Sequence, residues 1–399
     1  MELFSLPHEV LEAIISLLTP LDLISLSSTC KFFRELMLSD KVWVGACYTQ
    51  FGIKLSATGG FAEKFYKKVL HKYGEFLGLW NRHADCYGGL LQIKYLDEKL
   101  CAFDLQLPKD PHISNSLRPQ IVFSIELDEQ DTLSIACCIN PLKKHQCTLH
   151  YGKRALTPSS PQSFYLTRQC VNGIENADHQ DIFDDMENWL DEQSDYLGEN
   201  SAYSRRQMIY KYMVLRQTAL KTHYSRLVFP QRCNFRVPIQ PGLFKGTYSS
   251  LGLELIMLTY EEDVNKVKAI KISGDQNIPA GQITFRADLP FCMHLSQREQ
   301  ENLENIESIQ PASSDVEWHE LPPLQPFVVP QDCVERHNQV PNSCKARFHG
   351  FGQIAEEGFR EPTFVEGHWI VFNEDLFGFL WISLRALSMY HRVQEQLTN

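Results

Sequence analysis

The hydrophobic residues near the N-terminus repeat with the period of an α-helix. Val10, Leu11 and Ile14 are spaced to share one face of a first helix. Thr19 and Pro20 predict the start of a second helix, because threonine can cap the first turn and proline lacks the N–H group that this turn would leave unpaired. Three helices in about 45 residues bury little apolar surface among themselves. Part of the apolar face is therefore expected to be covered by something outside the module.

The hydrophobic period changes further along the chain. It stays helical over residues 61–80, where Phe61, Phe65 and Val69 repeat every fourth residue, and again between Asp181 and Thr222. Other segments are short, rich in β-branched and aromatic residues and bounded by turn residues, which indicates strands. The predicted strands are 88–95, 121–127, 132–137, 244–248, 253–258, 267–272, 282–289, 369–372 and 376–384.

Many short strands with glycine turns and one helical interruption are typical of a closed antiparallel barrel. We therefore predict an α+β chain in which an N-terminal helical module precedes a mostly antiparallel β-barrel domain. The predicted parts are the module at 1–50, a helical bridge at 51–82 and the barrel domain at 83–393, with an irregular segment at 137–180, a helical insertion at 181–222 and a flexible acidic loop at 296–322.

The first fifty residues resemble an F-box, the helical module by which a substrate receptor docks onto a ubiquitin-ligase scaffold. The resemblance rests on Leu6-Pro7, on Asp22-Leu23 after the second proline, on Cys30-Lys31-Phe32-Phe33 and on Val42-Trp43. The alternative is that these helices only cap the larger domain. If the module is an F-box, a helix-in-groove contact would complete the burial of its apolar residues against the scaffold protein Skp1. The residues expected in this contact are Leu6, Pro7, Val10, Ile14 and Leu23.

Charge and cysteine content narrow the class of protein. The 399 residues carry 49 acidic and 38 basic side chains, a net charge of −11, and no basic block with interleaved aromatic residues, so nucleic acid is not an expected partner. We see no signal peptide and no apolar run of 18 residues, so no membrane segment is expected. Twelve cysteines without a secretory signal indicate a reducing compartment, and we expect a cytoplasmic or nuclear protein, or both.

Longer motifs resemble the F-box only protein 31 family. They are PGLFKGTY at 241–248, ISGDQNIPAGQ at 272–282 and FNEDLFGF at 372–379, with YGGLL at 87–91 and DPH at 110–112. The similarity runs from about residue 6 to residue 393 and is weak over 150–235 and 296–322.

The family resemblance implies a function. It implies a β-barrel substrate receptor of a Skp1–cullin-1/RING ubiquitin ligase, with cell-cycle and DNA-damage roles, that marks its clients for proteasomal degradation. It also implies that the receptor holds the C-terminal ends of clients, D-type cyclins and chains ending in an amide among them.

Four residues form a candidate zinc site. Two cysteines with two histidines satisfy the tetrahedral preference of structural zinc, and the family carries a comparable set at this place. The spacing alone is wider than that of a zinc finger, so two buried thiols and two surface imidazoles are the alternative. The predicted ligands are Cys137, His145, Cys170 and His179, and the rival ligands are Cys138, Cys147 and His150.

A receptor for chain ends needs polar groups for the last peptide unit and apolar walls for the last side chains. The candidate polar residues are Lys245, Tyr248, Asn277 and Asp288, and the candidate walls are Phe377 and Trp381. A carboxylate such as Asp288 would accept from an amide N–H group and repel a free carboxylate. For each residue alone, a core or surface role is the alternative.

Motifs for catalysis are lacking. The sequence holds no Gly-x-Ser-x-Gly, no Walker loop, no dinucleotide-binding fingerprint and no His-Glu-x-x-His, so we predict a non-catalytic adaptor. Two alternatives remain, a barrel that binds a small ligand and an F-box scaffold that acts outside any ligase. Skp1 binding through Leu6, Pro7 and Ile14 would support ligase membership, whereas a closed apolar cavity would support the small-ligand barrel.

Overall fold

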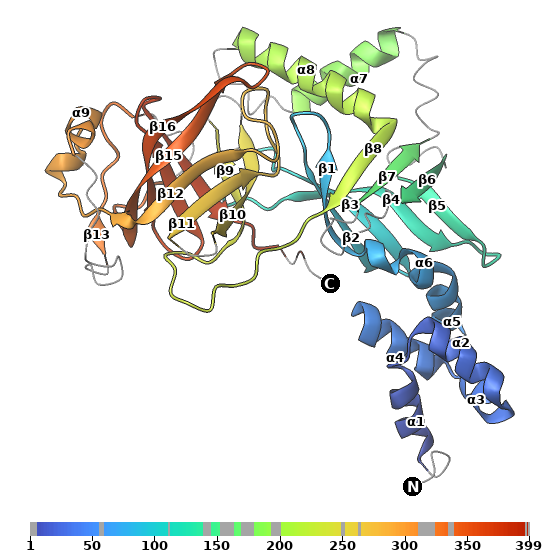
Figure 1. Ribbon diagram of the computed structural model, residues 1–399. Coiled ribbons are helices and arrows are strands. Elements are labelled where there is room, and N and C mark those ends of the chain that lie inside the picture. The colour runs from blue at the N-terminus through green and yellow to red at the C-terminus, as the bar shows by residue number, and fades with distance from the viewer. Residues whose placement is uncertain are drawn as a thin grey trace.

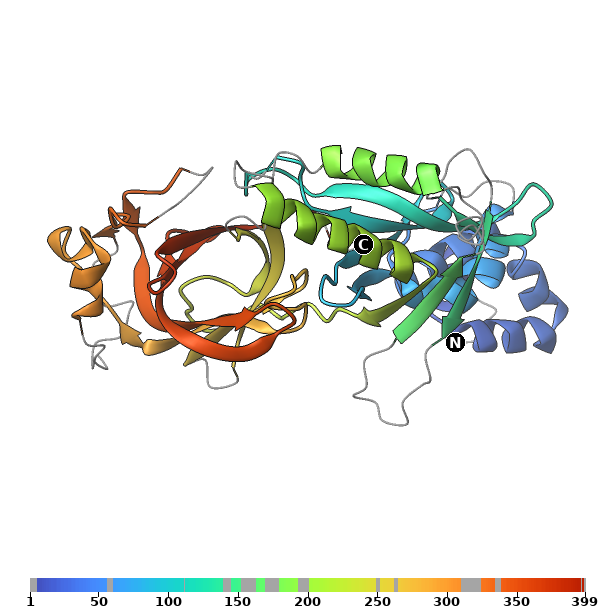
Figure 2. The same ribbon diagram turned by 90° about the horizontal axis from the view of Figure 1, so that it is seen from above.

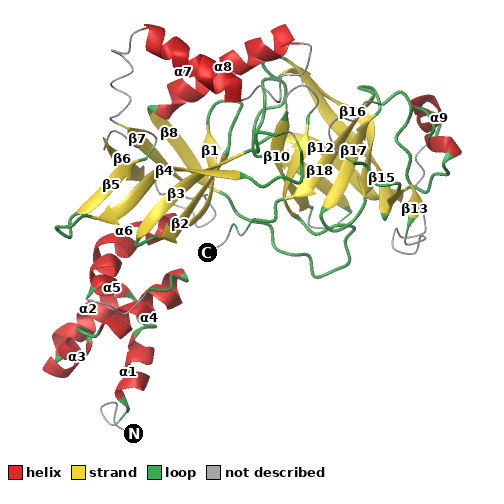
Figure 3. Cartoon of the chain, turned by 180° about the vertical axis from the view of Figure 1, so that it is seen from behind, coloured by secondary structure: helices red, strands yellow, loops and turns green. Residues whose placement is uncertain are grey.

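The protein consists of a helical N-terminal part and two β-barrels that lie side by side (Figures 1 and 3). The helical part extends from the first barrel, and two long helices lie over the junction of the barrels. The computed structural model describes residues 6–397, apart from 56–59, 111, 139–144, 152–162, 169–178, 193–200, 249–251, 262–264, 310–323, 334–338 and 396.

The N-terminal module contains four helices. They are α1 (His8–Ile15), α2 (Pro20–Thr29), α3 (Lys31–Leu36) and α4 (Asp40–Phe51). As predicted, Thr19 caps α2 by accepting a hydrogen bond from the backbone N–H group of Asp22 at 3.3 Å, and Pro20 occupies the first helical position. Gly52 ends α4 in the left-handed region, where glycine has no steric penalty.

A helical bridge connects this module to the first barrel. It comprises α5 (Phe61–Phe65), a π-helical turn (Tyr66–Leu70), α6 (His71–Tyr73) and a 3₁₀ turn (Gly74–Phe76). Phe76 packs edge-to-face on Phe164 of the barrel, with ring centroids 4.9 Å apart. The expectation of a helix up to residue 80 is wrong, because Gly78 has a φ of 112° and the chain enters a strand there. One continuous hydrophobic core runs from α1 through the bridge into this barrel.

The first barrel is an up-and-down meander. Its strands are β1 (Gly78–His83), β2 (Leu90–Leu96), β3 (Lys99–Gln106), β4 (Arg118–Leu127), β5 (Leu133–Cys137), β6 (His145–Tyr151), β7 (Ser163–Arg168) and β8 (Lys221–Arg226). The pairing of β8 with β1 closes the barrel, with Trp80 opposite Arg226. The helices α7 (His179–Glu192) and α8 (Ser201–Ala219) are inserted between β7 and β8.

The second barrel also closes with eight antiparallel strands, which Figure 2 shows nearly end-on. They are β9 (Gly242–Thr247), β10 (Leu253–Tyr260), β11 (Lys266–Lys271), β12 (Ile283–Cys292), β15 (Ala346–Glu356), β16 (Arg360–Val371), β17 (Leu376–Trp381) and β18 (Ala386–Arg392). Aromatic side chains fill its core, among them Phe285 and Phe377, whose ring centroids lie 5.9 Å apart. The short elements α9 (Leu303–Glu307), β13 (Gln325–Pro326) and β14 (Ser343–Cys344) lie beside this barrel (Figure 1).

The predicted α+β class, with an N-terminal helical module and a mostly antiparallel barrel, is confirmed. The strands close into two barrels, whereas we expected one over 83–393. The boundary is hard to read because β8, the strand that completes the first barrel, comes only after the helical insertion. Within the segment expected to be a flexible loop, residues 298–307 fold into a 3₁₀ turn and α9, while 310–323 lie outside the described residues. No helix among the described residues is long and apolar enough to cross a membrane.

The two barrels are joined by backbone hydrogen bonds. The loop before β2 lies against the turn after β11, so that Gly89 N–H donates to Ile272 O at 3.1 Å and Gly274 N–H donates to Tyr87 O at 3.1 Å. Gly88 needs to be glycine because its φ is 58° and a Cβ atom there would lie 2.5 Å from the carbonyl oxygen of Ile272. A shared apolar cluster from both barrels adds to this contact. The junction is therefore a fixed part of the fold.

Candidate functional site

Helix α1 presents an apolar stripe to solvent. Val10, Ile14 and Leu17 follow one another at helical spacing and are 42%, 43% and 69% exposed, whereas Leu11 and Ile15 face the core. An exposed stripe of this kind indicates a docking surface for another protein.

The residues proposed for docking differ in their exposure to solvent. Pro7, Val10 and Ile14 are exposed and Leu6 is half-buried, but Leu23 is only 1% exposed and belongs to the core of the module. Leu23 is therefore not available for a partner, because α2 turns it inward. Leu17 was missed; its position one turn after Ile14 could have identified it.

A second candidate site is the cleft between the barrels under helix α8. A cavity of about 320 Å³ adjoins a smaller one of about 40 Å³, and Tyr87, Lys211 and Leu253 contribute to the walls of both. Met208 and Lys211 come from α8, and Leu253 comes from the second barrel. Two domains and an inserted helix thus line a concave space, which is a common location for ligand sites.

Buried charges lie at the second-barrel end of this cleft. The Lys271 ammonium contacts Glu254 Oε2 and Asp275 Oδ2, each at 2.6 Å, and its side chain is fully buried. Asp275 Oδ1 also accepts hydrogen bonds from the backbone N–H groups of Asn277 at 2.6 Å and Ile278 at 2.8 Å. Two carboxyl groups therefore share one ammonium, and both carboxyl residues line the smaller cavity.

The environment shifts the pKa values of the two carboxyl groups in opposite directions. Burial raises the pKa of Glu254 well above its usual value, and the neighbouring Asp275 raises it further. Burial acts in the same direction on Asp275, but Lys271 and the backbone N–H groups hold the pKa of Asp275 below its usual value. At neutral pH this arrangement favours a protonated Glu254 beside an ionised Asp275, which places a donor and an acceptor together.

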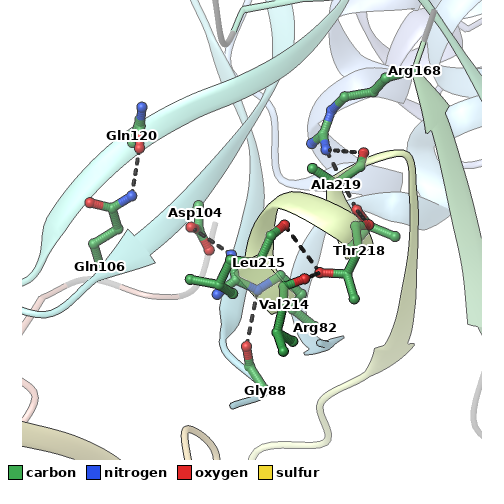
Figure 4. Close-up of polar contacts among 11 residues, drawn as sticks. Arg82, Gly88, Asp104, Gln106, Gln120, Arg168, Val214, Leu215, Thr218 and Ala219 are labelled. Atoms are coloured by element: carbon green, nitrogen blue, oxygen red, sulfur yellow. Dashed lines mark hydrogen bonds and ion pairs between the residues drawn. The ribbon is translucent and has the colours of Figure 1, made fainter. Parts of the chain in front are cut away.

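Basic residues line the first-barrel end of the cleft, and Figure 4 shows one of them, Arg82. Arg82 forms an ion pair with Asp104 at 2.9 Å and donates from Nε to Gly88 O at 3.0 Å. Gln106 donates to Gln120 at 2.5 Å on the neighbouring strands β3 and β4. Arg118 lines the same cavity and donates from Nε to Leu107 O at 2.9 Å.

Most polar residues proposed for the pocket serve the barrel instead. Lys245 is buried and donates to Asn115 O at 2.6 Å. Tyr248 bonds Thr284 Oγ1 at 2.7 Å, and its ring lies under the Lys271 ammonium at 4.3 Å, so it supports the charged cluster from behind. Asn277 donates from its side chain to Ala355 O at 2.9 Å.

The proposed acid and the proposed walls also need correction. Asp288 lies on β12 opposite Lys266 and does not line the cleft, whose acidic lining residues are Asp104, Glu254 and Asp275. Phe377 and Trp381 are 0% and 5% exposed in the core of the second barrel and cannot wall an open pocket. Alternation on a strand predicts which residues share a face but not which face is outside.

The zinc prediction falls mostly outside the described residues. Cys170 lies outside them, as do the side chains of His145 and His179. Cys137 is buried at the end of β5 and is the direct cross-strand partner of His145 on β6. Such partners hold their Cβ atoms about 5 Å apart, a separation that suits two ligands of one metal ion. Within the described ranges, no group of three or more histidine, cysteine or acidic residues is arranged to hold a metal.

Comparisons with known proteins agree with this architecture. Residues 3–49 match the family described as F-box-like, and residues 224–396 match the family described as Cyclin D1 binding domain. F-box only protein 31-B of Xenopus laevis is 29% identical over 450 residues, covering 99% of this chain and 84% of the relative. F-box only protein 31 is 29% identical in Rattus norvegicus and 28% identical in Homo sapiens, in each case over 100% of this chain and 86% and 84% of the relative. The chain is therefore similar to the F-box only protein 31 proteins over its whole length, with an F-box-like match over its N-terminal helices and a Cyclin D1 binding domain match over its second barrel.

Proposed function

We propose that the protein is the substrate-recognition subunit of a Skp1–cullin–F-box ubiquitin ligase and that it holds the C-terminal ends of client proteins in the cleft between the barrels. The F-box-like module and the cyclin D1 binding domain support the role of substrate receptor. The observation that carries the finer proposal is the pair of carboxyl groups, Glu254 and Asp275, at the end of the cleft.

The chemistry of this pair suits a primary amide. An amide terminus offers an N–H group, which an ionised Asp275 can accept, and a carbonyl oxygen, to which a protonated Glu254 can donate. A free carboxylate offers two acceptors and a negative charge, so Asp275 would repel it. We therefore propose that chains ending in an amide bind more tightly than the same chains ending in a free acid.

The proposed ligase role uses two separate sites, the exposed stripe of α1 and the cleft between the barrels. The exposed stripe of α1 is proposed to bind Skp1 and, through it, cullin-1 and the RING subunit, while the cleft holds the client. D-type cyclins are proposed clients because the domain at 224–396 matches the cyclin D1 binding family. In this role the chain performs no catalysis and presents clients for ubiquitination and proteasomal degradation in the cytoplasm or the nucleus.

A structural zinc ion is also part of the proposal. Cys137, His145, Cys170 and His179 would hold it, and the ladder position of Cys137 beside His145 supports the first half of this set. The ion would tie the segment between β5 and α7 to the wall of the first barrel.

A pair of matched peptides tests the cleft. The full chain bound to Skp1 is titrated with two fluorescent peptides that differ only in an amide or a free acid at the C-terminus. We expect the amide to bind at least tenfold more tightly, and we expect Asp275→Asn to remove that preference. Asp288→Asn replaces a carboxylate that lies outside the cleft and should leave the preference for the amide intact. Equal binding of both peptides by the unmodified protein would contradict the proposal.

The small-ligand alternative is less well supported. Phe285, Phe377 and Tyr390 pack against one another in the core of the second barrel, with centroid distances of 4.7 to 5.9 Å. Side chains packed at these distances occupy the space that a ligand inside the barrel would need.

A further inference from the structure

The net charge of the residues that line the cleft changes sign between its two ends. At the second-barrel end, Glu254 and Asp275 outnumber Lys271. At the first-barrel end, Arg82, Arg118 and Lys211 line the larger cavity, while Asp104 is the one acidic residue among the described lining residues. The ion pair between Arg82 and Asp104 neutralises one of these bases. Two positive charges, Arg118 and Lys211, are left over.

Lys211 projects from α8 into the passage between the two cavities, both of which it lines. Its ammonium lies 5.6 Å from the centroid of the Tyr87 ring. No hydrogen bond from this ammonium to a described residue is found. Burial in the cleft lowers the pKa of Lys211, and the nearby Arg82 adds to this effect while Glu254 opposes it. A partly desolvated ammonium without a hydrogen-bonded anion gains from an anionic ligand.

Arg118 stands at the first residue of β4, across the larger cavity from α8. Its Nε atom is fixed by the carbonyl oxygen of Leu107 at 2.9 Å. That contact orients the guanidinium and uses one of its five N–H donors, and no hydrogen bond from its terminal nitrogens to a described residue is found. A planar guanidinium with both terminal nitrogens open matches the two oxygens of a carboxylate.

The two ends of the cleft are continuous, since Tyr87, Lys211, Leu253 and Ser273 contribute to both cavities. An extended peptide whose terminus contacts Asp275 would therefore pass Lys211 and Arg118 with its preceding residues. Each residue of extended chain adds about 3.3 Å, so a cavity of this size corresponds to the last few residues of a client.

We propose that the basic end of the cleft is a second subsite, which selects clients carrying an acidic side chain among the four residues before the terminal one. Arg118 and Lys211 are its specificity-determining residues. This inference rests on the proposed function, because it assumes that a client terminus lies at the acidic end. The ligand class is an acidic peptide tail: a carboxylate side chain for Arg118 and Lys211, followed by a neutral amide terminus for Glu254 and Asp275.

The test scans one peptide position at a time. The full chain bound to Skp1 is titrated with amidated fluorescent peptides that carry Glu, Gln or Lys at each of the four positions before the last residue. At one position or more we expect Glu to bind about tenfold more tightly than Gln, and Lys to bind more weakly than Gln. This preference should weaken as the salt concentration rises, since part of it is Coulombic.

Variants connect the preference to the two bases. Arg118→Gln and Lys211→Gln should each reduce the Glu preference, and together they should abolish it, while the preference for amide over free acid remains. Lys54→Gln removes an exposed base outside the cleft and should change neither preference. Arg118→Glu should reverse the selection so that the Lys peptide binds best, a gain that misfolding cannot produce.

The outcomes separate the two proposals. If amidated peptides bind but no position prefers Glu, or if the preference survives in the double variant, the second subsite is refuted and the terminus site stands. If no peptide terminus of either kind is bound by the unmodified complex, the terminus site itself is refuted and the subsite falls with it.

Discussion

Replacing Lys271 with methionine should destabilise the second barrel strongly. The side chain is fully buried and its ammonium contacts two carboxyl groups at 2.6 Å each. At an effective dielectric constant of about 20, the contact with the ionised Asp275 is worth roughly 6 kcal/mol before desolvation is subtracted. Removing one partner of a buried ion pair typically costs about 3–5 kcal/mol, because the remaining charge stays buried without compensation. We expect Lys271→Met to lower the free energy of unfolding by this amount at pH 7.

The loss should depend on pH in a defined direction. The pKa of Glu254 is already raised in the unmodified protein. Without the ammonium, the pKa of Asp275 in the folded protein should also rise above that of an aspartate in the unfolded chain, which is about 4. The folded state then binds more protons than the unfolded state, so its stability falls as pH rises through this window. The defect of Lys271→Met should therefore be smaller at pH 5 than at pH 7.

Chemical denaturation followed by tryptophan fluorescence measures both effects, since Trp369 and Trp381 lie in the core of the same barrel. Lys268→Met is the matched control, because Lys268 lies on the same strand with a partly exposed side chain. A loss below about 1 kcal/mol at pH 7, or the same loss at both pH values, would refute the account of the buried cluster.

Three further changes test other parts of the structure. Ile14→Asp places a charge in the exposed stripe of α1 and should reduce Skp1 binding at least a hundredfold in a pull-down or titration while peptide binding persists; retained Skp1 binding would contradict the docking face. Gly246→Ala places a Cβ atom 2.1 Å from the Tyr390 ring and should cost about 1–3 kcal/mol of unfolding free energy, whereas Gly378→Ala, with its nearest atom at 3.2 Å, should cost less, and equal costs would argue against the packing shown. A zinc chelator should lower the melting temperature, and Cys137→Ser should remove that response whereas Cys101→Ser, which removes another buried thiol, should not; indifference of the unmodified protein to chelation would exclude a stabilising metal.

Local sequence signals account for the parts of the fold that could be predicted. Thr19 and Pro20 determine a helix start through their own capping group and ring, so the second helix begins where expected. Strands β10, β11 and β17 begin within one residue of the predicted positions, because apolar runs between turn residues define them locally. Each of these features depends on residues that are neighbours in the sequence.

The unpredicted parts depend on long-range pairing. Closure of the first barrel requires β8 to pair with β1 across the whole helical insertion, and no local pattern encodes that choice. Asp288, the acid proposed for the pocket, does not line the cleft, whereas Asp275 does, although both lie close to predicted strands. Asp275 enters the cleft because the backbone N–H groups of Asn277 and Ile278 hold its carboxylate in a tight turn, and the first barrel then packs against that turn.

The unbroken core between the docking helices and the first barrel has a mechanical consequence. The ring of Trp43 in α4 packs at a tilt against that of Tyr66 in the bridge, with centroids 5.2 Å apart, and the rings of Phe65 and Tyr95 of the barrel lie 5.6 Å apart. Little free rotation is therefore available between the helical module and the first barrel. A client held by its last residues would thus be tethered at a constant height above the ligase scaffold. Its lysines could approach the transferred ubiquitin only as far as the client's own tail allows, at about 3.3 Å for each extended residue. The length of the tail between the cleft and the folded body of the client would determine which lysine of the client is modified.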